Sequence, residues 1–180
     1  MSEEKYPAFG KIPRLRREVI VTEKIDGTNG LIAVAADGSV RAGSRNRWLT
    51  LESDNFGFAR WVSERAELLA GVLGEGHHYG EWFGQGIQRT YGLDHKRFAL
   101  FDSSRWNEDD LPDDLHVVPV LTVGPFDYAV DTALAVLREN GSVAVPGFDK
   151  PEGVVVWHTA SRSYFKVLLE NDSAPKGAAA

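Results

Sequence analysis

The stretch VTEKIDGTNG, residues 21–30, places a lysine between a β-type run and a sharp turn. Residues 19–25, VIVTEKI, are rich in β-branched side chains and predict a strand. The Asp, Gly and Asn that follow Lys24 are turn residues. A lysine at the end of a buried strand is either a salt-bridged side chain in an ordinary hairpin or a nucleophile. The rest of the chain has to decide between the two.

The composition narrows the class of protein. A length of 180 residues and a hydrophobic content of 43% suit one domain, with room for two lobes, around a substantial core. The sequence has neither an apolar run of transmembrane length nor an N-terminal signal core, so we expect no membrane association. We expect a cytoplasmic protein, in the host cell if it is viral. The absence of cysteine excludes disulfides, thiolate metal sites and cysteine nucleophiles.

Charge is distributed unevenly along the chain. The net charge of −6 argues against binding nucleic acid by bulk attraction, because proteins that bind in this way are usually basic. Residues 107–115, NEDDLPDDL, predict an acidic surface loop. Residues 11–17, KIPRLRR, form a basic segment that is either a solvated arm or a local contact for a polynucleotide. Its basic side chains are Lys11, Arg14, Arg16 and Arg17.

The hydrophobic pattern predicts strands that alternate with helices. Residues 30–44 predict a hairpin that turns at Asp37-Gly38. Further strands are predicted at 77–84, 97–104, 153–158 and 163–169. The order of strands, helix, strands, helix, strands favours an α+β fold with antiparallel sheets over a doubly wound parallel sheet.

Two helices are predicted between these strands. Residues 55–70 are helical by spacing. The side chains near one face of that helix are Phe58, Trp61, Val62, Leu68 and Leu69. Residues 127–140 form the second helix, with Asp127 as its N-cap and Gly141 as its stop.

Common nucleotide and metal motifs are missing. The sequence has no Walker-type glycine loop, no GxGxxG after a strand and no HExxH pair. His77 and His78 are adjacent on a predicted strand and so point to opposite faces, which argues against a shared metal site.

Four charged residues fall within or beside apolar strands, where they are costly unless paired or used in chemistry. They are Lys24, Glu81, Glu152 and Lys166. One interpretation is two internal salt bridges, because structural ion-pair networks are common. The other is a shared cleft that collects two lysines and two glutamates.

The sequence motifs around these four residues favour the second interpretation, a shared cleft. EKIDGTN resembles KxDGxN, the nucleotidyl-lysine motif of the covalent nucleotidyltransferases. YGEWFGQGIQ, RFALFD, EGVVVW and YFKV resemble the later motifs of that superfamily in the same order. The combination is most similar to ATP-dependent RNA ligases of the phage double-strand-sealing type. The resemblance covers residues 21–168.

The resemblance implies a fold and a reaction. The fold is two antiparallel β-sheets flanked by helices with a nucleotide cleft between them, as in nucleotidyltransferases and ATP-grasp-like ligases. In the reaction, a lysine attacks the α-phosphate of ATP, and AMP passes to a 5′-phosphate that a 3′-hydroxyl then attacks. The implied cofactors are ATP and Mg²⁺ or Mn²⁺. A second cation and a metal would lower the pKa of the lysine and neutralise the triphosphate.

The resemblance also implies roles for individual residues. Lys24 is the nucleophile, with Lys166 as the second cation and Glu152 as the metal ligand. Glu23 and the backbone of Ile25 lie beside the adenine, Glu81 binds the ribose and Asn29 takes part in sealing. Phe101 stacks on the base, or is an ordinary core phenylalanine. Asp26 positions Lys24 and metal-bound water, or simply forms a turn. Arg45 contacts the nucleotide or the end to be joined. Arg47 is the alternative residue for this role, because alternate positions on a strand share a face.

The sequence departs from the family pattern in two places. Leu168 stands where many members have a second lysine, two positions after Lys166, so Lys176 or an arginine would have to supply that charge. The last motif also comes near the end of the sequence, whereas ligases usually carry a C-terminal OB or helical domain. We expect residues 1–170 to form the adenylation domain and residues 171–180 to form a flexible tail. The core and the basic segment would then hold the polynucleotide.

Three functions remain in competition. The first is a minimal, monomeric ATP-dependent ligase that seals nicks in RNA or RNA/DNA duplexes. The second is another nucleotidyltransferase, such as a DNA ligase or a capping-type enzyme. The third is a catalytically weak nucleotide-binding or nucleic-acid-binding module on the same fold. The intact set of four charged residues argues against the third, and the motif asparagine and Gly-Ile-Gln favour the first over the second.

Overall fold

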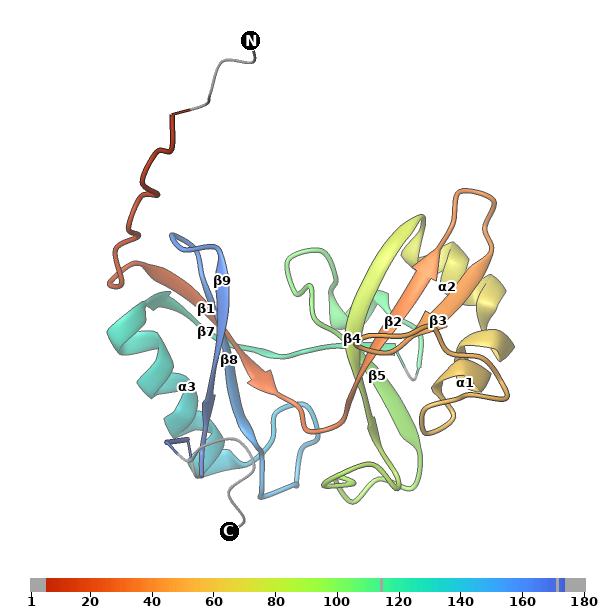
Figure 1. Cartoon of the computed structure of the whole chain (residues 1–180). Helices are drawn as coiled ribbons and strands as arrows, with labels where there is room; N and C mark the ends of the chain where they lie inside the picture. Colours follow the sequence, from red (N-terminus) through yellow and green to blue (C-terminus); the bar gives the residue numbers. More distant parts are fainter. Residues whose placement is uncertain (1–5, 114, 171, 174–180) are drawn as a thin grey trace.

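Two β-sheets lie side by side in the computed structural model, with the chain crossing between them (Figure 1), and residues of both sheets line a cleft. The structure describes residues 6–113, 115–170 and 172–173. The predicted tail at 171–180 therefore lies outside the described residues, except for 172 and 173.

The first lobe is a four-stranded antiparallel sheet. Its strands run in the order β7 (Val120–Pro125), β1 (Glu18–Lys24), β8 (Gly153–His158) and β9 (Ser163–Leu168). Helix α3 (Phe126–Asn140) covers the face away from the cleft (Figure 1). The valines of β1 and β8 that point to this face are fully buried against α3, which leaves the alternate residues to face the cleft.

The second lobe is a five-stranded sheet. Its order is β3 (Val40–Gly43), β2 (Thr28–Val34), β4 (Gly76–Gly84), β5 (Lys96–Leu100) and β6 (Leu115–Val117). Helices α1 (Phe58–Glu64) and α2 (Ala66–Leu73) cover its outer face, where a cluster of aromatic rings forms the core. These rings belong to Phe58, Trp61, Trp82 and Phe98. A short 3-10 helix, η1 (Glu108–Asp110), interrupts the acidic loop.

A third apolar cluster joins the lobes. Ile25, at the crossing from β1 to β2, packs with Phe83 from the end of β4 and Tyr91 from the loop after it. Val118, at the second crossing, and Val145, from the loop after α3, complete the contact. Because both crossings are buried here, this cluster fixes how the two sheets meet below the cleft.

The α+β architecture, the hairpin at Asp37-Gly38 and the order of elements are confirmed. The second sheet is not purely antiparallel, since β6 pairs with β5 in parallel. Strands β6 and β7 were not predicted. None of the described helices has the length and apolar character needed to cross a bilayer.

Both predicted helices need correction. The helix predicted at 55–70 is two helices, because the backbone at Arg65 leaves the helical region with φ of −118°. Leu68 consequently lies 47% exposed and not on the buried face. Asp127 is not the N-cap of α3: Pro125 takes that position, and Asp127 lies in the first turn, where its carboxylate pairs with Arg16 at 3.1 Å. Gly141 does end α3.

Two facing glycines make room for the aromatic core of the second lobe. Gly30 and Gly80 are cross-strand partners, and a β-carbon on Gly80 would meet the Ala99 carbonyl and lie 2.6 Å from the Phe98 ring. We predict that Gly80→Ala lowers the free energy of unfolding by about 1–3 kcal/mol, the usual cost of overpacking a core. Urea unfolding monitored by tryptophan fluorescence measures it.

Gly71→Ala is the matched control. Gly71 lies in α2, and a β-carbon there meets nothing within 4 Å. This substitution should leave stability unchanged or raise it by up to about 1 kcal/mol, because alanine favours helix more than glycine does. Equal stability of the two variants would contradict the assignment of Gly80 to a packed position.

Candidate active site

Lys24 is the last residue of β1 and points into the cleft, just before the chain crosses to the other lobe. Ile25 anchors the crossing in the cluster between the lobes. Gly27 follows at a position where a β-carbon would strike the Trp82 carbonyl and lie 2.8 Å from the β-carbon of Phe83. Only glycine fits so close to β4, so the turn after Lys24 is held tightly against the second sheet.

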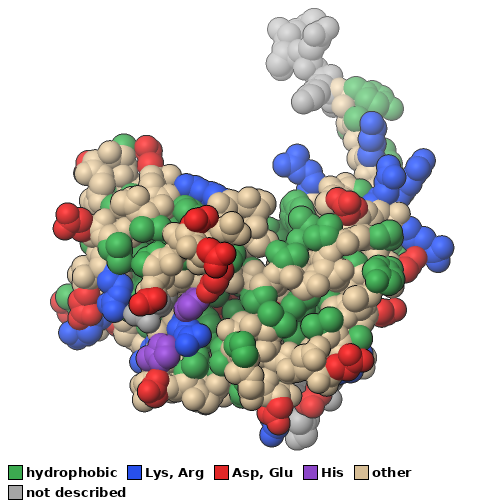
Figure 2. Space-filling model, turned by 180° about the vertical axis from the view of Figure 1, so that it is seen from behind, with side chains coloured by type: hydrophobic (Ala, Val, Ile, Leu, Met, Phe, Trp, Pro, Cys, Tyr) green, Lys and Arg blue, Asp and Glu red, His purple; other side chains and the backbone are tan. Residues whose placement is uncertain are grey.

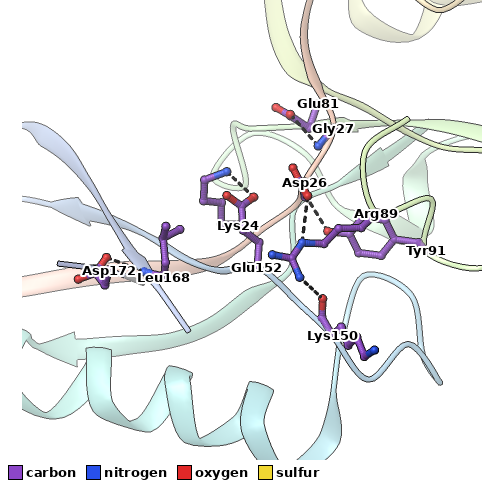
Figure 3. A network of polar contacts seen from close by, with 10 residues as sticks. All are labelled: Lys24, Asp26, Gly27, Glu81, Arg89, Tyr91, Lys150, Glu152, Leu168 and Asp172. Carbon is purple, nitrogen blue, oxygen red and sulfur yellow. Dashed lines mark hydrogen bonds and ion pairs between the residues drawn. The ribbon is translucent and has the colours of Figure 1, made fainter. Parts of the chain in front are cut away.

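The amine of Lys24 forms an ion pair with Glu152. Its Nζ lies 2.6 Å from Oε2 of Glu152, and the two side chains are 23% and 16% exposed (Figure 3). The pairing of β1 with β8 brings them together, because Lys24 is the cross-strand partner of Gly153. A partly buried pair with this geometry holds the amine in one place.

Glu81 approaches the same amine from the second sheet. Its Oε1 accepts a hydrogen bond from the backbone N–H of Gly27 at 3.2 Å. The pKa of the Glu81 carboxyl is raised to about 7, chiefly by burial and to a smaller extent by the charge on Glu152, while Lys24, the Gly27 N–H and Arg45 lower it. Glu81 is thus a carboxyl group that changes its charge near neutral pH.

Asp26 belongs to a network that the sequence did not reveal (Figure 3). Its carboxylate pairs with Arg89 at 2.9 Å, and the same guanidinium donates to the backbone carbonyl of Lys150 at 3.0 Å. The backbone N–H of Asp26 donates to the hydroxyl of Tyr91 at 2.7 Å. Asp26 is therefore more than a turn former, because it links the crossing to the loop after β4.

The loop that carries Arg89 and Tyr91 has an unusual backbone. Gln88, Thr90 and Tyr91 all have positive φ, between 42° and 58°. Side chains larger than glycine rarely adopt this conformation, and it persists where the surroundings impose it. Here Tyr91 is 2% exposed and packs between the rings of Phe83 and Phe148, one from each lobe. No sequence motif signals an arginine or tyrosine of this kind in a loop.

The cleft above these residues is one cavity of about 770 Å³. Strand alternation arranges its side chains in rows that rise from the crossing, with about 7 Å between successive rows on a strand. In the first lobe the lowest row contains Lys24, Gly153 and Leu168; the middle row contains Thr22, Val155 and Lys166; and the upper row contains Ile20, Trp157 and Tyr164.

The second lobe supplies corresponding rows. Asn29 and Glu81 are partners in the lowest row, and Leu31 and Tyr79 are partners in the middle row. Phe101 joins Tyr79, because its backbone N–H donates to the Tyr79 carbonyl at 2.9 Å. Phe101 lines the cavity and is 37% exposed, so it is not an ordinary core phenylalanine. His77 lies in the upper row.

Lys166 lies on the cleft face but is exposed, so the expectation that its strand buries it is wrong. It is the cross-strand partner of Val155. Among the described residues, Lys24 and Glu152 form one internal salt bridge, and Lys166 forms none with Glu81. Leu168 faces the same way as Lys166, as alternation requires, and its backbone N–H donates to Asp172 at 2.8 Å.

Glu23 faces away from the cleft and is 1% exposed. Its carboxylate accepts hydrogen bonds from the Ser142 hydroxyl at 2.6 Å and from the backbone N–H groups of Val143 and Ala144 at 2.8 Å each. Burial raises the pKa of Glu23, and these hydrogen bonds oppose the rise. The Glu23 carboxylate thus fastens the loop after α3 and is already engaged there, so it is not available to a ligand in the cavity.

Arg45 and Arg47 lie in the turn after β3, not on a strand, so the argument from alternate strand positions does not apply. Arg47 is bound to its own loop, with its guanidinium donating to the Ser53 carbonyl and hydroxyl at 2.8 and 2.9 Å. Arg45 is exposed and lies close enough to Glu81 to lower the pKa of that carboxyl. Of the two, Arg45 is the one whose charge affects the site.

The basic segment is an exposed arm. Its side chains lie in solvent where the chain leaves the body of the molecule (Figures 1 and 2). It joins the end of β1 that lies away from Lys24, about 20 Å along the strand. Ile20, near that end, lines the outer part of the cavity, so the arm begins near the cavity's outer rim. Arg16 turns away to pair with Asp127 on α3.

A model of the RNA ligase family matches residues 17–168, which include every cavity residue described above. The chain belongs to the RNA ligase family. No curated protein matches this RNA ligase family member by sequence.

Solved structures of the RNA ligase of Naegleria gruberi share its fold. A variant of that enzyme with AMP and Mn superposes with a TM-score of 0.60 and 20% identity, over 86% of this chain and 50% of that chain. A structure of the same enzyme with PPi gives a TM-score of 0.61 and 21% identity, over the same shares of the two chains. This RNA ligase family member therefore spans about half the length of the Naegleria ligase.

The raised pKa of Glu81 makes stability depend on pH. An unfolded glutamate ionises near pH 4.3, whereas folded Glu81 ionises near 7, so its stabilising contribution is complete below about pH 4 and is lost as the pH rises to 7. Glutamine cannot ionise. We predict that Glu81→Gln gains stability relative to the wild type between pH 5 and 8, by on the order of 2 kcal/mol.

Urea unfolding of both proteins at several pH values tests this prediction. Glu139→Gln, at an exposed glutamate on α3, serves as the control for the loss of one negative charge, and it should not reproduce the gain of Glu81→Gln. A difference for Glu81→Gln that is flat across this range would show that the carboxyl titrates normally.

Proposed function

We propose that this RNA ligase family member is an ATP-dependent polynucleotide ligase that joins a 5′-phosphate to a 3′-hydroxyl at nicks in RNA or RNA/DNA duplexes. The observation that carries the proposal is the position of Lys24. A lysine amine held at the bottom of a nucleotide-sized cavity, between two carboxylates and inside the region that matches the family, is suited to attack a phosphate.

The proposed first step forms a bond between Nζ of Lys24 and the α-phosphorus of ATP and breaks the bond to the bridging oxygen, so that pyrophosphate leaves. A lysine amine is protonated in ordinary surroundings, so it has to lose a proton before it attacks. The Glu152 carboxylate, 2.6 Å away, is in position to pass that proton on to solvent, so that Glu152 is charged again when it holds the metal ion. AMP then passes from Lys24 to the 5′-phosphate, and attack by the 3′-hydroxyl releases it.

The rows of the cavity suit an adenylate on Lys24. Glu81 in the lowest row offers a carboxyl group to the ribose hydroxyls. In the middle row Phe101 and Val155, from opposite lobes, offer two faces between which a base can lie. The solved structures of the Naegleria ligase with AMP or ATP and Mn support ATP and a divalent cation here.

A divalent cation fits the acidic groups at the bottom of the cavity. Within the described ranges no three acidic or histidine side chains converge as a complete metal cage. Mg²⁺ and Mn²⁺ do not need one, because in nucleotide enzymes one or two carboxylates and substrate phosphates suffice. Glu152 would hold the ion, which would supply charge neutralisation to the triphosphate. Lys166 and Arg45 are two exposed cations that would add to it.

Other readings of the site make different predictions. A capping-type enzyme would attach GMP to Lys24, and a catalytically weak binding module would attach nothing. RNA, DNA and hybrid strands differ by 2′-hydroxyl contacts, which leave no sequence motif. We retain ATP over GTP, a monomer and a cytoplasmic location as parts of the proposal.

We predict that Lys24 becomes covalently adenylated when the protein is incubated with ATP and Mg²⁺ or Mn²⁺. Intact-mass spectrometry should show one AMP adduct, and Lys24→Ala should abolish it because the nucleophile is lost. Lys150→Ala is the matched control: the Lys150 side chain points away from Lys24, so its removal should leave the adduct intact (Figure 3). An adduct that persists in Lys24→Ala, or a guanylated product from GTP, would overturn the proposal.

We predict that the basic segment serves sealing and not self-adenylation. Arg14→Ala/Arg16→Ala/Arg17→Ala should form the adduct normally, because that step uses only ATP. It should bind and seal nicked duplex less well than the wild type at low salt, and this deficit should shrink as salt rises, because each lost phosphate contact lowers the salt slope of binding by about 0.7–0.9. The measurement compares adduct yield and nick sealing across a salt series. Equal sealing by both proteins at every salt concentration would make the segment a solvated arm.

A further inference from the structure

The upper row of the cavity holds aromatic surface that the proposed adenylate leaves unused. Trp157 and Tyr164 are cross-strand partners on β8 and β9. Their ring centroids lie 4.5 Å apart at an interplanar angle of 45°, and both residues line the cavity. Tyr164 is nevertheless 67% exposed, so this pair offers its rings to the cleft and not to the core.

The register places this pair beyond the reach of the proposed adenine. Trp157 lies four residues along β8 from Gly153, the partner of Lys24, which corresponds to about 13 Å. Val155 and Phe101 already offer the two faces that one base can occupy, and they lie one row lower. The aromatic pair is therefore a separate surface in the same cavity, nearer to its open end.

The charge around the pair suits a nucleotide. Lys166 lies one row below on the same face of β9, two residues from Tyr164, and its side chain is exposed. Rings on which bases stack, with a cation beside them for the phosphate, are how proteins hold single nucleotides of a strand. On the opposite wall His77 and Tyr79 add ring surface in the upper and middle rows.

We propose that Trp157 and Tyr164 form a base-stacking subsite for a nucleotide that flanks the join in the polynucleotide. The inference rests on the proposed ligase function and names one place where its substrate is held. The subsite recognises a nucleobase by its ring face, so it accepts any of the bases. The adenylate on Lys24 and the flanking nucleotide occupy different rows and are bound together.

The probe is a fluorescent nicked duplex whose 5′ end is already adenylated and whose facing 3′ end lacks its hydroxyl, so that it binds without reacting. Three forms are compared by fluorescence anisotropy: the intact duplex and two duplexes in which one nucleotide beside the nick, on either side, is abasic. For the wild type, removal of the stacked base should weaken binding by about tenfold at one of the two positions.

The double variant Trp157→Ala/Tyr164→Ala should bind the intact duplex as weakly as the wild type binds the abasic one, and the abasic change should cost it nothing further. With Trp157→Phe/Tyr164→Phe, the abasic duplex should again bind more weakly than the intact duplex, since phenylalanine keeps a ring. Tyr128→Ala is the control, because Tyr128 is equally exposed, at 65%, but lies on α3 outside the cleft.

An abasic penalty of equal size in the wild type and the double variant, or no penalty at either position in the wild type, would overturn the subsite. A failure of the ligase proposal itself would be seen in a different measurement: intact-mass spectrometry would show no AMP adduct on Lys24. The double variant should still form that adduct from ATP, which shows that it is folded and that the lost interaction concerns the polynucleotide alone.

Discussion

The contact between the Lys24 amine and the Glu152 carboxylate is the interaction on which the site depends. Arg89 binds to the chain near each of these two residues. Arg89 binds the Asp26 carboxylate, two residues from Lys24, and the Lys150 carbonyl, two residues from Glu152. It comes from a loop of the second lobe, whereas Lys24 and Glu152 both belong to the first. The geometry of the pair is thus tied to how the lobes meet, and the apolar cluster around Tyr91 fixes that meeting.

Charge at the bottom of the cavity is balanced only while Lys24 is a cation. Its amine stabilises both Glu152 and Glu81, and the pKa of Glu81 already stands near 7. In the proposed reaction Lys24 loses its positive charge when it binds AMP, which frees the Glu152 carboxylate. Two carboxyl groups facing phosphate oxygens would repel them, so a divalent cation on Glu152 and a proton on Glu81 each lower the energy of the adenylated state. Burial is the main reason why the pKa of Glu81 stands near neutral pH, which makes such a proton available.

The sequence predicted those parts of the structure that follow from the alternation of side chains between the two faces of a strand, in strands that carry a motif. Lys24, Glu81 and Lys166 are polar residues within apolar strands, and their strands do bring them to one cleft. The parts it missed depend on contacts between distant segments. The Glu23 carboxylate binds backbone N–H groups about 120 positions away, and Arg89 reaches a carbonyl 61 positions away. Strand β6 has three residues, too few for a period to be read, and the break at Arg65 leaves no proline or glycine to mark it.

The cleft face of the first lobe also explains how an acidic protein could hold a polyanion. Among the described residues in its three rows, Lys24 and Lys166 are the cations, while Leu168 fills a place where charge was expected and Trp157 and Tyr164 fill the upper row. The exposed arm adds further attraction for phosphate outside the cavity, and the upper row of the cavity offers ring surface. Phosphate contacts weaken as salt rises, whereas stacking depends on the base. On the proposed function, binding has one part that depends on salt, from the arm, and one part that depends on the stacked base, from Trp157 and Tyr164. Both parts come from the Glu18 end of β1, away from Lys24.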